Sequence, residues 1–462
     1  MCIPARRIGV ILFATLFFSY SYVHQDKFKT EIPVSRLDLL HAVWSQRTFQ
    51  IDAYHTNTPD KAVHEGHYYC DKAPGVFILA LPAFSLATGW LAWQGIPLDS
   101  DAGWLISSWV TCAGSLAVIT ALGGVALFAW LCQWVQPRRA YIATLALFLG
   151  TAAFPYCTLL MSHAAVIGLL TISLWASDCG IPERGRSRIF DGRDMLAGCS
   201  AGLALSCEYS AGIAVVGILA CPLVSKPKRI VSILLGLVPP LMLIPAYHWV
   251  CFGDPFTIAY NHEAVFTQMH ENFFGIKFPP SGENIVSLLL SARRGLFIWS
   301  PVLLLALVGC FSLYRVSRGL FWVTYAVSIV QVLLIGGYYT LYAGGSYGPR
   351  FLAPLLPLLA LPTAFGIARF SRTGLVLATI SVLMTSLTVV VSIFIPPRYD
   401  NPLWEFYVPA FLQPSLSPNL GSVLGLSGHI SLLPLVLGVS LGISLGWRLM
   451  PGDKPKPDRT MG

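Results

Sequence analysis

Charged side chains are scarce in this sequence. Lys and Arg number 30 and Asp and Glu 22 among 462 residues, so 11% of the chain is charged, whereas a soluble domain carries about 25%. So few charges cannot cover the surface of a water-soluble body of this size. Hydrophobic residues make up 55%. This composition excludes an ordinary cytosolic enzyme, a disordered protein and a nucleic-acid-binding module, and it is typical of a polytopic membrane protein.

Several familiar cofactor and metal motifs are also missing. The 11 cysteines contain no C-x-x-C pair, which favours small buried hydrophobes over a disulfide framework or a metal cluster. No P-loop or dinucleotide fingerprint occurs, so nucleotide-driven chemistry is not indicated. The net charge of +8 comes from short basic clusters between apolar runs. This pattern indicates membrane-flanking charge and no nucleic-acid partner.

Apolar runs dominate what is present. The first, 8–23, follows Arg6-Arg7 and has no small-residue cleavage site, so we expect an uncleaved first helix that starts in the cytoplasm, not a cleaved signal peptide. The further runs are 74–94, 104–135, 140–156, 160–177, 195–206, 210–224, 230–250, 296–313, 320–342, 351–368, 374–395 and 430–447. A spanning helix needs about 20 apolar residues, so the runs predict an all-α polytopic protein with about 12 to 14 transmembrane helices.

The connectors between runs predict the orientation. Basic clusters at 136–139, 184–193, 226–229, 315–318, 369–372 and after Arg448 belong in the cytoplasm by the positive-inside rule. Three long connectors then face outward, at about 24–73, 251–295 and 396–429. We expect one membrane domain over 1–450, with both termini cytoplasmic, and a disordered cytoplasmic tail over 451–462.

Three runs depart from a simple pattern of full crossings. The chain must cross the membrane an odd number of times between the first outward loop and Arg138-Arg139, so we expect 74–94 to lie in the interface or to re-enter, because 104–135 reads as one helix. The short runs 195–206 and 210–224 meet at Glu208. An acid between two short apolar runs predicts broken helices that line a cavity.

The first outward loop holds most of the reactive groups. It includes Asp52 and Asp60 and ends with Asp71-Lys72. A lysine at the mouth of a membrane cavity can hold an anionic head group, while carboxylates can act as a general base or bind a metal ion. The alternative is a solvated loop in which Lys72 and the neighbouring tyrosines anchor the chain at the membrane interface.

Arginines in the other outward loops break the positive-inside pattern. Arg293-Arg294 stand directly before a helix that starts on the outside, and Arg350 ends a glycine-containing loop that starts at Gly344. A bound anion would explain them, and interfacial capping arginines are the alternative. His163 lies near an outer turn, where a histidine is more often a hydrogen-bonding residue than a ligand.

The three loops together resemble those of the polytopic glycosyltransferases of the GT-C class, in particular bacterial relatives of protein O-mannosyltransferases and lipid A aminoarabinose transferases. The resemblance is carried by Tyr69-Cys70-Asp71-Lys72-Ala73-Pro74, Arg293-Arg294-Gly295-Leu296-Phe297 and Ser346-Tyr347-Gly348-Pro349-Arg350. In helix pattern it covers nearly the whole chain.

The resemblance implies an inverting transfer of a sugar from a polyprenyl-phosphate donor to a glycan, lipid or protein acceptor, at the outer face of a bacterial inner membrane. A carboxylate would act as base, and fixed positive charge would hold the leaving phosphate. The residues that match these roles are Lys72, Arg293, Arg294, Arg350, Tyr69 and Tyr347 for phosphate and lipid, and His67, His163 and Glu263 for substrate. Asp71 is implied as partner of the base or as a metal ligand, and the need for a divalent metal ion stays open.

The sequence departs from the class in its acids. The class usually carries an acid pair soon after the first helix, where this chain reads Val34-Ser35-Arg36-Leu37-Asp38. The base is then Asp60, Asp52 or, by a shift of register, Asp38, and a second acid common in the next outward turn is replaced by Ser162-His163. Two other hypotheses remain: a transporter or flippase of a lipid-linked solute, or a non-catalytic membrane relative.

Overall fold

The computed structural model describes residues 3–25, 31–180, 190–225, 227–270, 275–341 and 344–451. Asp26, in the first outward loop, and all but the first residue of the predicted tail lie outside these described residues. Every predicted apolar run is helical. The only sheet in the described residues is a hairpin of β1 (Ala62–His64) and β2 (His67–Tyr69), in which Val63 pairs with Tyr68. The chain is therefore an all-α polytopic membrane protein, as the sequence predicts.

Length and composition alone single out seven helices of the described residues as able to cross a membrane. They are Gly75–Trp93, Asp101–Leu131, Pro227–Phe252, Arg318–Gly336, Arg350–Arg369, Ser371–Val391 and Gly428–Arg448. Three shorter apolar helices are Ser162–Ala176, Tyr209–Val224 and Pro301–Val316. The count of 12 to 14 transmembrane helices stays a prediction, because several predicted runs form helices shorter than a full span.

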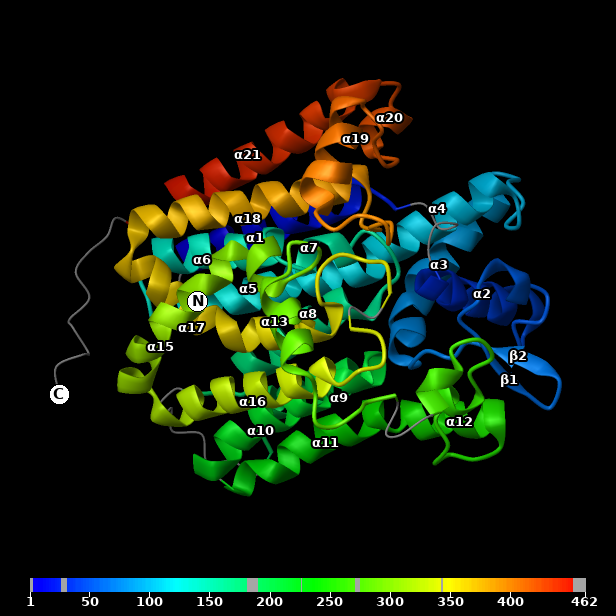
Figure 1. Cartoon of the computed structure of the whole chain (residues 1–462), viewed down its shortest axis with the longest axis horizontal. Coiled ribbons are helices and arrows are strands. Elements are labelled where there is room, and N and C mark those ends of the chain that lie inside the picture. Colours follow the sequence, from blue (N-terminus) through cyan, green and yellow to red (C-terminus); the bar gives the residue numbers. More distant parts are fainter. Residues whose placement is uncertain are drawn as a thin grey trace.

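The helices fall into a bundle and an outer layer (Figure 1). The bundle contains α1 (Ile3–Tyr22), α5 (Val118–Leu131), α6 (Pro137–Leu149), α8 (Ser162–Ala176), α9 (Gly192–Cys207), α10 (Gly212–Ser225), α11 (Ile230–Leu241), α15 (Leu304–Val316), α16 (Arg318–Gly336), α17 (Leu356–Arg369), α18 (Ser371–Val391) and α21 (Leu433–Arg448). Short helices connect them: α7 (Ala153–Tyr156), α13 (Gly282–Leu290), α14 (Leu296–Trp299), α19 (Val408–Leu412) and α20 (Leu420–Val423).

Glycine allows the closest helix packing in this bundle. In the contact between α9 and α11, a Cβ on Gly198 would collide with the carbonyl oxygen of Ile233, and one on Gly236 with that of Met195. Small residues let helix backbones approach in membranes, where dispersion contacts replace the hydrophobic effect as the main attraction. We infer that these glycines fix the position of α9, whose end carries Glu208 into the candidate site.

The outer layer consists of α2 (Glu31–Gln46), the hairpin, α3 (Gly75–Trp93), α4 (Asp101–Cys112) and α12 (Leu243–Phe252), all at one end of the molecule (Figure 1). The helix Asp101–Leu131 is continuous, as expected, with a π-helical turn at Ala113–Ala117 between α4 and α5. Helix α3 packs against α4 in this layer. An interfacial position for 74–94 stays a prediction, since its length also allows a crossing.

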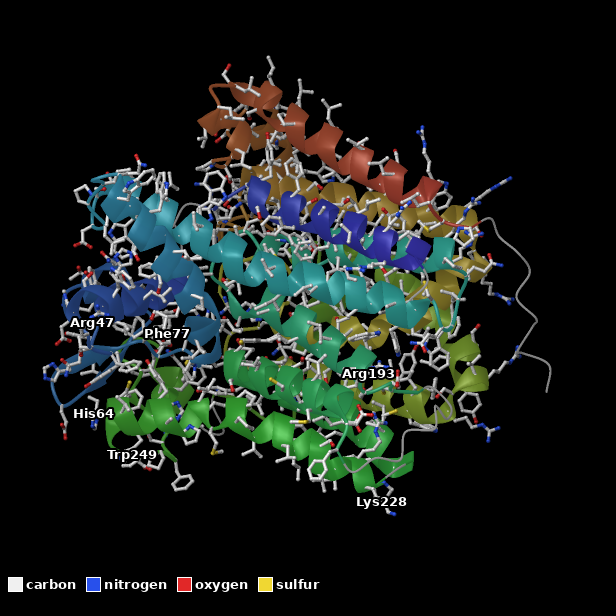
Figure 2. All side chains as sticks on the ribbon, turned by 180° about the vertical axis from the view of Figure 1, so that it is seen from behind. Arg47, His64, Phe77, Arg193, Lys228 and Trp249 are labelled. Atoms are coloured by element: carbon white, nitrogen blue, oxygen red, sulfur yellow. The ribbon has the colours of Figure 1, made fainter. Side chains whose placement is uncertain are left out.

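The two ends of the molecule can be told apart by their labelled side chains. Figure 2 shows Arg193 and Lys228 at one end, and Arg47, His64 and Trp249 at the other. The start of α6 and the end of α21 meet at the end that carries Arg193 and Lys228. There the Arg138 guanidinium lies 5.1 Å from the Trp447 ring centre. We call this the inner end and the opposite one the outer end.

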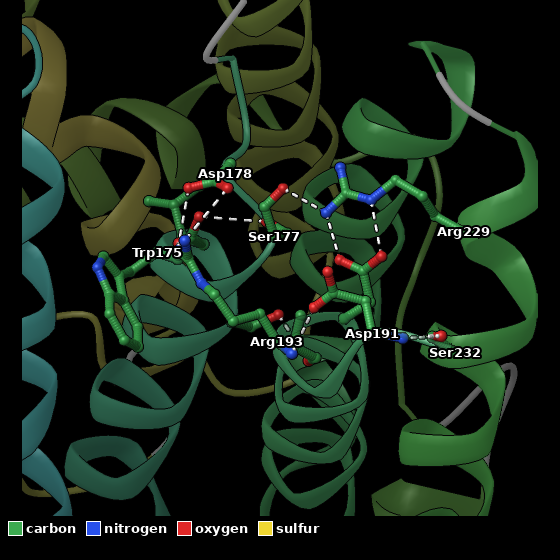
Figure 3. Close-up of polar contacts among 11 residues, drawn as sticks. Trp175, Ser177, Asp178, Asp191, Arg193, Arg229 and Ser232 are labelled. Atoms are coloured by element: carbon green, nitrogen blue, oxygen red, sulfur yellow. Dashed lines mark hydrogen bonds and ion pairs between the residues drawn. The ribbon is translucent and has the colours of Figure 1, made fainter. Parts of the chain in front are cut away.

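Two partly buried ion pairs fasten the helices at the inner end (Figure 3). Arg229 Nε donates to Asp194 Oδ2 at 2.8 Å, and Arg193 Nη2 donates to Asp178 Oδ1 at 3.0 Å. Both arginines also donate to backbone carbonyls at the end of α8, those of Ser177 and Trp175 respectively. These helix-end ion pairs therefore join α8, α9 and the start of α11, with one carboxylate for each guanidinium.

Candidate active site

The start of α3 carries Asp71 and Lys72 into the interior. Gly75 lies so close to the backbone of Ser206 and Cys207, at the end of α9, that a Cβ there would collide with it. The hydroxyl of Tyr247 in α12 donates to the carbonyl oxygen of Cys70 at 2.8 Å. Proline and glycine after the lysine thus let the loop end pack tightly against a broken helix.

Lys72 lies between two carboxylates. Its Nζ is 2.5 Å from Asp71 Oδ2 and 3.1 Å from Asp60 Oδ2. The exposed fractions are 7% for Lys72, 3% for Asp60 and 0% for Asp71, so the pairs are withdrawn from water. Two of the predicted catalytic acids and the predicted phosphate-binding lysine therefore form one group.

Glu263 joins this group from the second outward loop. Ala62 forms a bridge with Glu263, and Ala264 N donates to the Lys61 carbonyl oxygen at 3.0 Å, so this loop extends the hairpin. Burial, and then repulsion from Asp71 with a hydrogen bond to it, raise the pKa of Glu263 to about 8. Glu263 is thus protonated near neutral pH and can donate to Asp71. We call Asp60, Asp71, Lys72 and Glu263 the lysine cluster.

Electrostatics keeps the lysine charged. Burial alone would lower the pKa of Lys72, but attraction from Asp60 and Asp71 outweighs it and raises the pKa well above its usual value. Burial also raises the pKa of Asp60, against the attraction of Lys72 and, more weakly, of Arg350. A charged lysine beside an acid with a raised pKa is the arrangement expected of a site that holds an anion and accepts a proton.

An apolar cavity of about 710 Å³ lies between α10 and α16, near the lysine cluster. Tyr260 lines it, and the Tyr260 ring centre is 5.9 Å from Lys72 Nζ. Its walls are mostly aliphatic, including Val216, Val327 and Leu334. Glu208 lines the same cavity at the break between α9 and α10, which confirms the prediction of broken helices beside a cavity.

A second cavity of about 610 Å³ contains the predicted arginines. Arg293, Arg294 and Arg350 all line it, together with Gly344 and Ile395. Arg294 donates to the carbonyl oxygens of Gly344 and, at 3.2 Å, of Ile395. Burial lowers the pKa of Arg294 to about 10, so its guanidinium stays charged at neutral pH. We call this the arginine cavity.

The two cavities meet at one wall. Arg350 lines the arginine cavity while the next residue, Phe351, lines the apolar one. Met161 lines the arginine cavity, and the hydroxyl of the next residue, Ser162, donates to Glu208 Oε2 at 2.8 Å. The wall between the two cavities therefore contains Arg350 and Phe351.

Asp52 and His67 lie elsewhere. His67 Nδ1 is 2.7 Å from Asp52 Oδ2, and the backbone N–H of Tyr68 donates to Asp52 Oδ1. Partial burial would raise the pKa of Asp52, but these hydrogen bonds outweigh it and leave the pKa below its usual value. The side chains are 41% and 47% exposed, so this pair stabilises the exposed hairpin and is separate from the lysine cluster.

The remaining candidates lie behind the cavities. Tyr347 is buried, and its hydroxyl donates to the Trp299 carbonyl oxygen at 2.9 Å. His163 is buried against Tyr156 and Phe351, and Tyr69 packs against Phe252. None of the three lines either of the two cavities. Asp38 is fully buried, with Oδ1 accepting from Asn57 Nδ2 at 3.0 Å.

Sequence reasoning did not select Tyr260 and Tyr338 as site residues, although both line the apolar cavity next to the lysine cluster. Tyr260 stands three residues before Glu263, and this proximity was the only signal available. Within the described residues, no group of three or more His, Cys, Asp or Glu side chains has an arrangement that could hold a metal ion.

The chain has the fold of the GT-C membrane glycosyltransferases, as its likeness to solved structures shows. Among solved structures it is similar to ArnT from Cupriavidus metallidurans. The ArnT structure bound to undecaprenyl phosphate is 13% identical over 97% of this chain and 76% of that one, with a TM-score of 0.52. The apo structure is 14% identical over 96% and 75%, with a TM-score of 0.51. No family model and no curated protein matches the sequence. The resemblance is confirmed for the fold.

Proposed function

We propose that this protein is a glycosyltransferase that moves a sugar from a polyprenyl-phosphate donor to an acceptor at the outer face of a bacterial inner membrane. The observation that carries the proposal is the buried, charged Lys72 beside Tyr260, a residue that lines an apolar cavity between α10 and α16. A prenyl chain needs such an apolar cavity, and its phosphate needs fixed positive charge. The similar ArnT structure contains undecaprenyl phosphate.

The chemistry divides between three side chains. Asp60 accepts the proton of the acceptor hydroxyl as that oxygen attacks the anomeric carbon from the face opposite the phosphate, which inverts the configuration. The bond from the anomeric carbon to the phosphate oxygen breaks, and the electron pair stays on the lipid phosphate. Lys72 and Arg350 stabilise the charge that develops there. Asp71 and Glu263 hold Lys72 in place.

The charges at the two ends support the proposed orientation. The inner end carries Arg138, Arg193 and Arg229, so the positive-inside rule places it in the cytoplasm and the lysine cluster outside. Both chain termini are then cytoplasmic.

A transfer assay tests the proposal. Purified protein in nanodiscs is given radiolabelled polyprenyl-phosphate sugars and candidate acceptors, beside the variants Lys72→Met and Lys61→Met. Lys61 is the matched control: it lies in the same loop, but its Nζ donates to the His55 carbonyl oxygen at 2.6 Å and lies outside the cluster. We expect label in an acceptor with the wild type and Lys61→Met, and a loss of at least about 100-fold with Lys72→Met.

Three results would contradict the proposal. Equal transfer by Lys72→Met and Lys61→Met would remove Lys72 from the reaction. Movement of the intact lipid-linked sugar across the membrane would favour the transporter hypothesis, with Glu208 as its acid. Tight binding of undecaprenyl phosphate without any turnover would favour the non-catalytic one.

A further inference from the structure

The arginine cavity has more positive charge than a donor phosphate requires. Arg350 lies at the wall between the two cavities, and together with Lys72, which lies next to Tyr260, it suffices for one phosphate. Arg293 lines the arginine cavity but not the apolar one. Its Nη2 donates to the Pro397 carbonyl oxygen at 2.6 Å, at the part of the cavity formed by the third outward loop.

The hydrogen-bonding capacity of these arginines is only partly used. Within the described residues, Arg293 and Arg350 form no ion pair, and the buried Nε of each has no hydrogen-bond partner. A guanidinium presents five N–H donors in a fixed plane, which suits the oxygens of a phosphate or carboxylate. Three guanidinium groups around one cavity also repel one another unless an anion lies between them.

Apolar side chains line part of the walls between the arginines. Ile32, Pro33, Phe394 and Pro396 line the same cavity. A volume of about 610 Å³ matches a site for a whole small molecule or head group, not for a lone ion. The expected occupant therefore has an anionic group and an apolar or sugar-like body.

We propose that the arginine cavity binds a phosphate or carboxylate group of the acceptor, so that the acceptor of this enzyme is an anionic molecule. The acceptor role rests on the proposed function; the anion site does not. With its anionic group on Arg293 and Arg294, the acceptor extends toward the wall at Arg350, where its hydroxyl reaches Asp60 and the donor.

The test measures anion binding without requiring transfer. Binding of inorganic pyrophosphate and, in a separate arm, of succinate is measured by calorimetry on the full chain in nanodiscs of uncharged lipid. The variants are Arg293→Gln, Arg293→Lys and, as matched control, Arg398→Gln. Arg398 lies one residue after Pro397, but it donates to the Tyr399 hydroxyl at 2.7 Å and does not line the cavity.

We expect at least one of the two anions to bind. Binding of pyrophosphate would indicate a site for phosphate, and binding of succinate a site for carboxylate. Arg293→Gln should weaken anion binding about tenfold or more, because a charge-assisted hydrogen-bond pair is lost. Arg293→Lys should weaken it less, and Arg398→Gln should bind as the wild type does. The thermal midpoint without anion shows whether each variant is folded.

Donor binding separates this inference from the proposed function. With saturating pyrophosphate or succinate, the affinity for undecaprenyl phosphate should stay within about twofold of its value without the anion, since the two sites are distinct. Failure of undecaprenyl phosphate to bind, with Arg293-dependent anion binding intact, would overturn the proposed function and leave the anion site standing. Any of three results would overturn the inference: that neither anion binds, that Arg293→Gln binds the anion as tightly as the wild type, or that the anion competes fully with undecaprenyl phosphate.

Discussion

The buried charges at the two ends of the molecule differ in their balance. At the inner end two guanidinium groups are each paired with a carboxylate, Arg229 with Asp194 and Arg193 with Asp178. In the lysine cluster one ammonium group faces three carboxyl groups, one of which is kept protonated by its surroundings. Balanced pairs fasten helices, whereas a buried excess of acid costs stability and needs another explanation. The difference indicates that the inner end serves the fold and the outer end serves chemistry.

The largest expected effect separates two acids of the same loop. Asp60→Asn should lower the transfer rate by about 1000-fold, because a general base in contact with the reacting hydroxyl contributes between about 100-fold and 10,000-fold. The transfer rate of Asp52→Asn should stay within about threefold of the wild-type rate, since Asp52 binds His67 at the exposed hairpin. Initial rates on purified, folded protein measure both. Inactivity of Asp52→Asn with normal rates for Asp60→Asn would reverse the assignment.

Substitutions in the ion pairs of the inner end should lower the stability of the protein and leave its transfer rate unchanged. Asp194→Ala leaves Arg229 without its buried carboxylate and should cost about 3 kcal/mol. The thermal midpoint should fall, while the transfer rate per folded molecule is retained. The double variant Asp194→Leu with Arg229→Met should recover most of the loss, because no unpaired charge remains. A loss of rate in folded Asp194→Ala would break the contrast between the two ends.

The apolar cavity offers an intermediate effect. Val216→Trp should fill the cavity and weaken undecaprenyl phosphate binding about tenfold, because it displaces apolar contacts of the prenyl chain. Val224→Trp on the same helix, α10, is the control, since Val224 is 86% exposed and does not line the cavity. Binding to detergent-solubilised protein measures the effect. Equal weakening by both variants would argue against a lipid in this cavity.

The smallest expected effect is on the pH dependence of stability. The folded protein holds the Glu263 proton up to about pH 8, whereas the ordinary pKa is 4.5. The folded state thus binds more protons than the unfolded state between these values, so the contribution of Glu263 to stability falls as pH rises from 4.5 to 8. Glu263→Gln removes this contribution. Between pH 5 and pH 8 the thermal midpoint of the wild type should fall more than that of the variant, by about a few degrees. Parallel curves would show that Glu263 is ionised in the folded protein.

The helices and the broken pair at Glu208 could be predicted from the sequence, because a membrane requires long apolar runs and makes a buried acid conspicuous. The anomaly of Arg293-Arg294 at an outward helix start also pointed to the arginine cavity. Such signals are local along the chain and need no knowledge of tertiary contacts.

The choice among the acids could not be made in the same way. Asp52 and Asp60 are both polar residues of one loop, and only the pairing of the hairpin turns one outward and the other onto Lys72. Glu263 reaches Asp71 across a long sequence separation, through a single bridge to Ala62. Burial of Tyr347 and His163 behind the cavities likewise depends on how distant helices pack.

A structure of the full chain with undecaprenyl phosphate, determined by electron cryomicroscopy in nanodiscs, tests the central claim most directly. We expect the phosphate within hydrogen-bond distance of Lys72 Nζ and the prenyl chain between α10 and α16, with the arginine cavity still free for a second molecule. A lipid whose phosphate lies on Arg293, or whose chain lies outside the cavity lined by Val216 and Leu334, would contradict it.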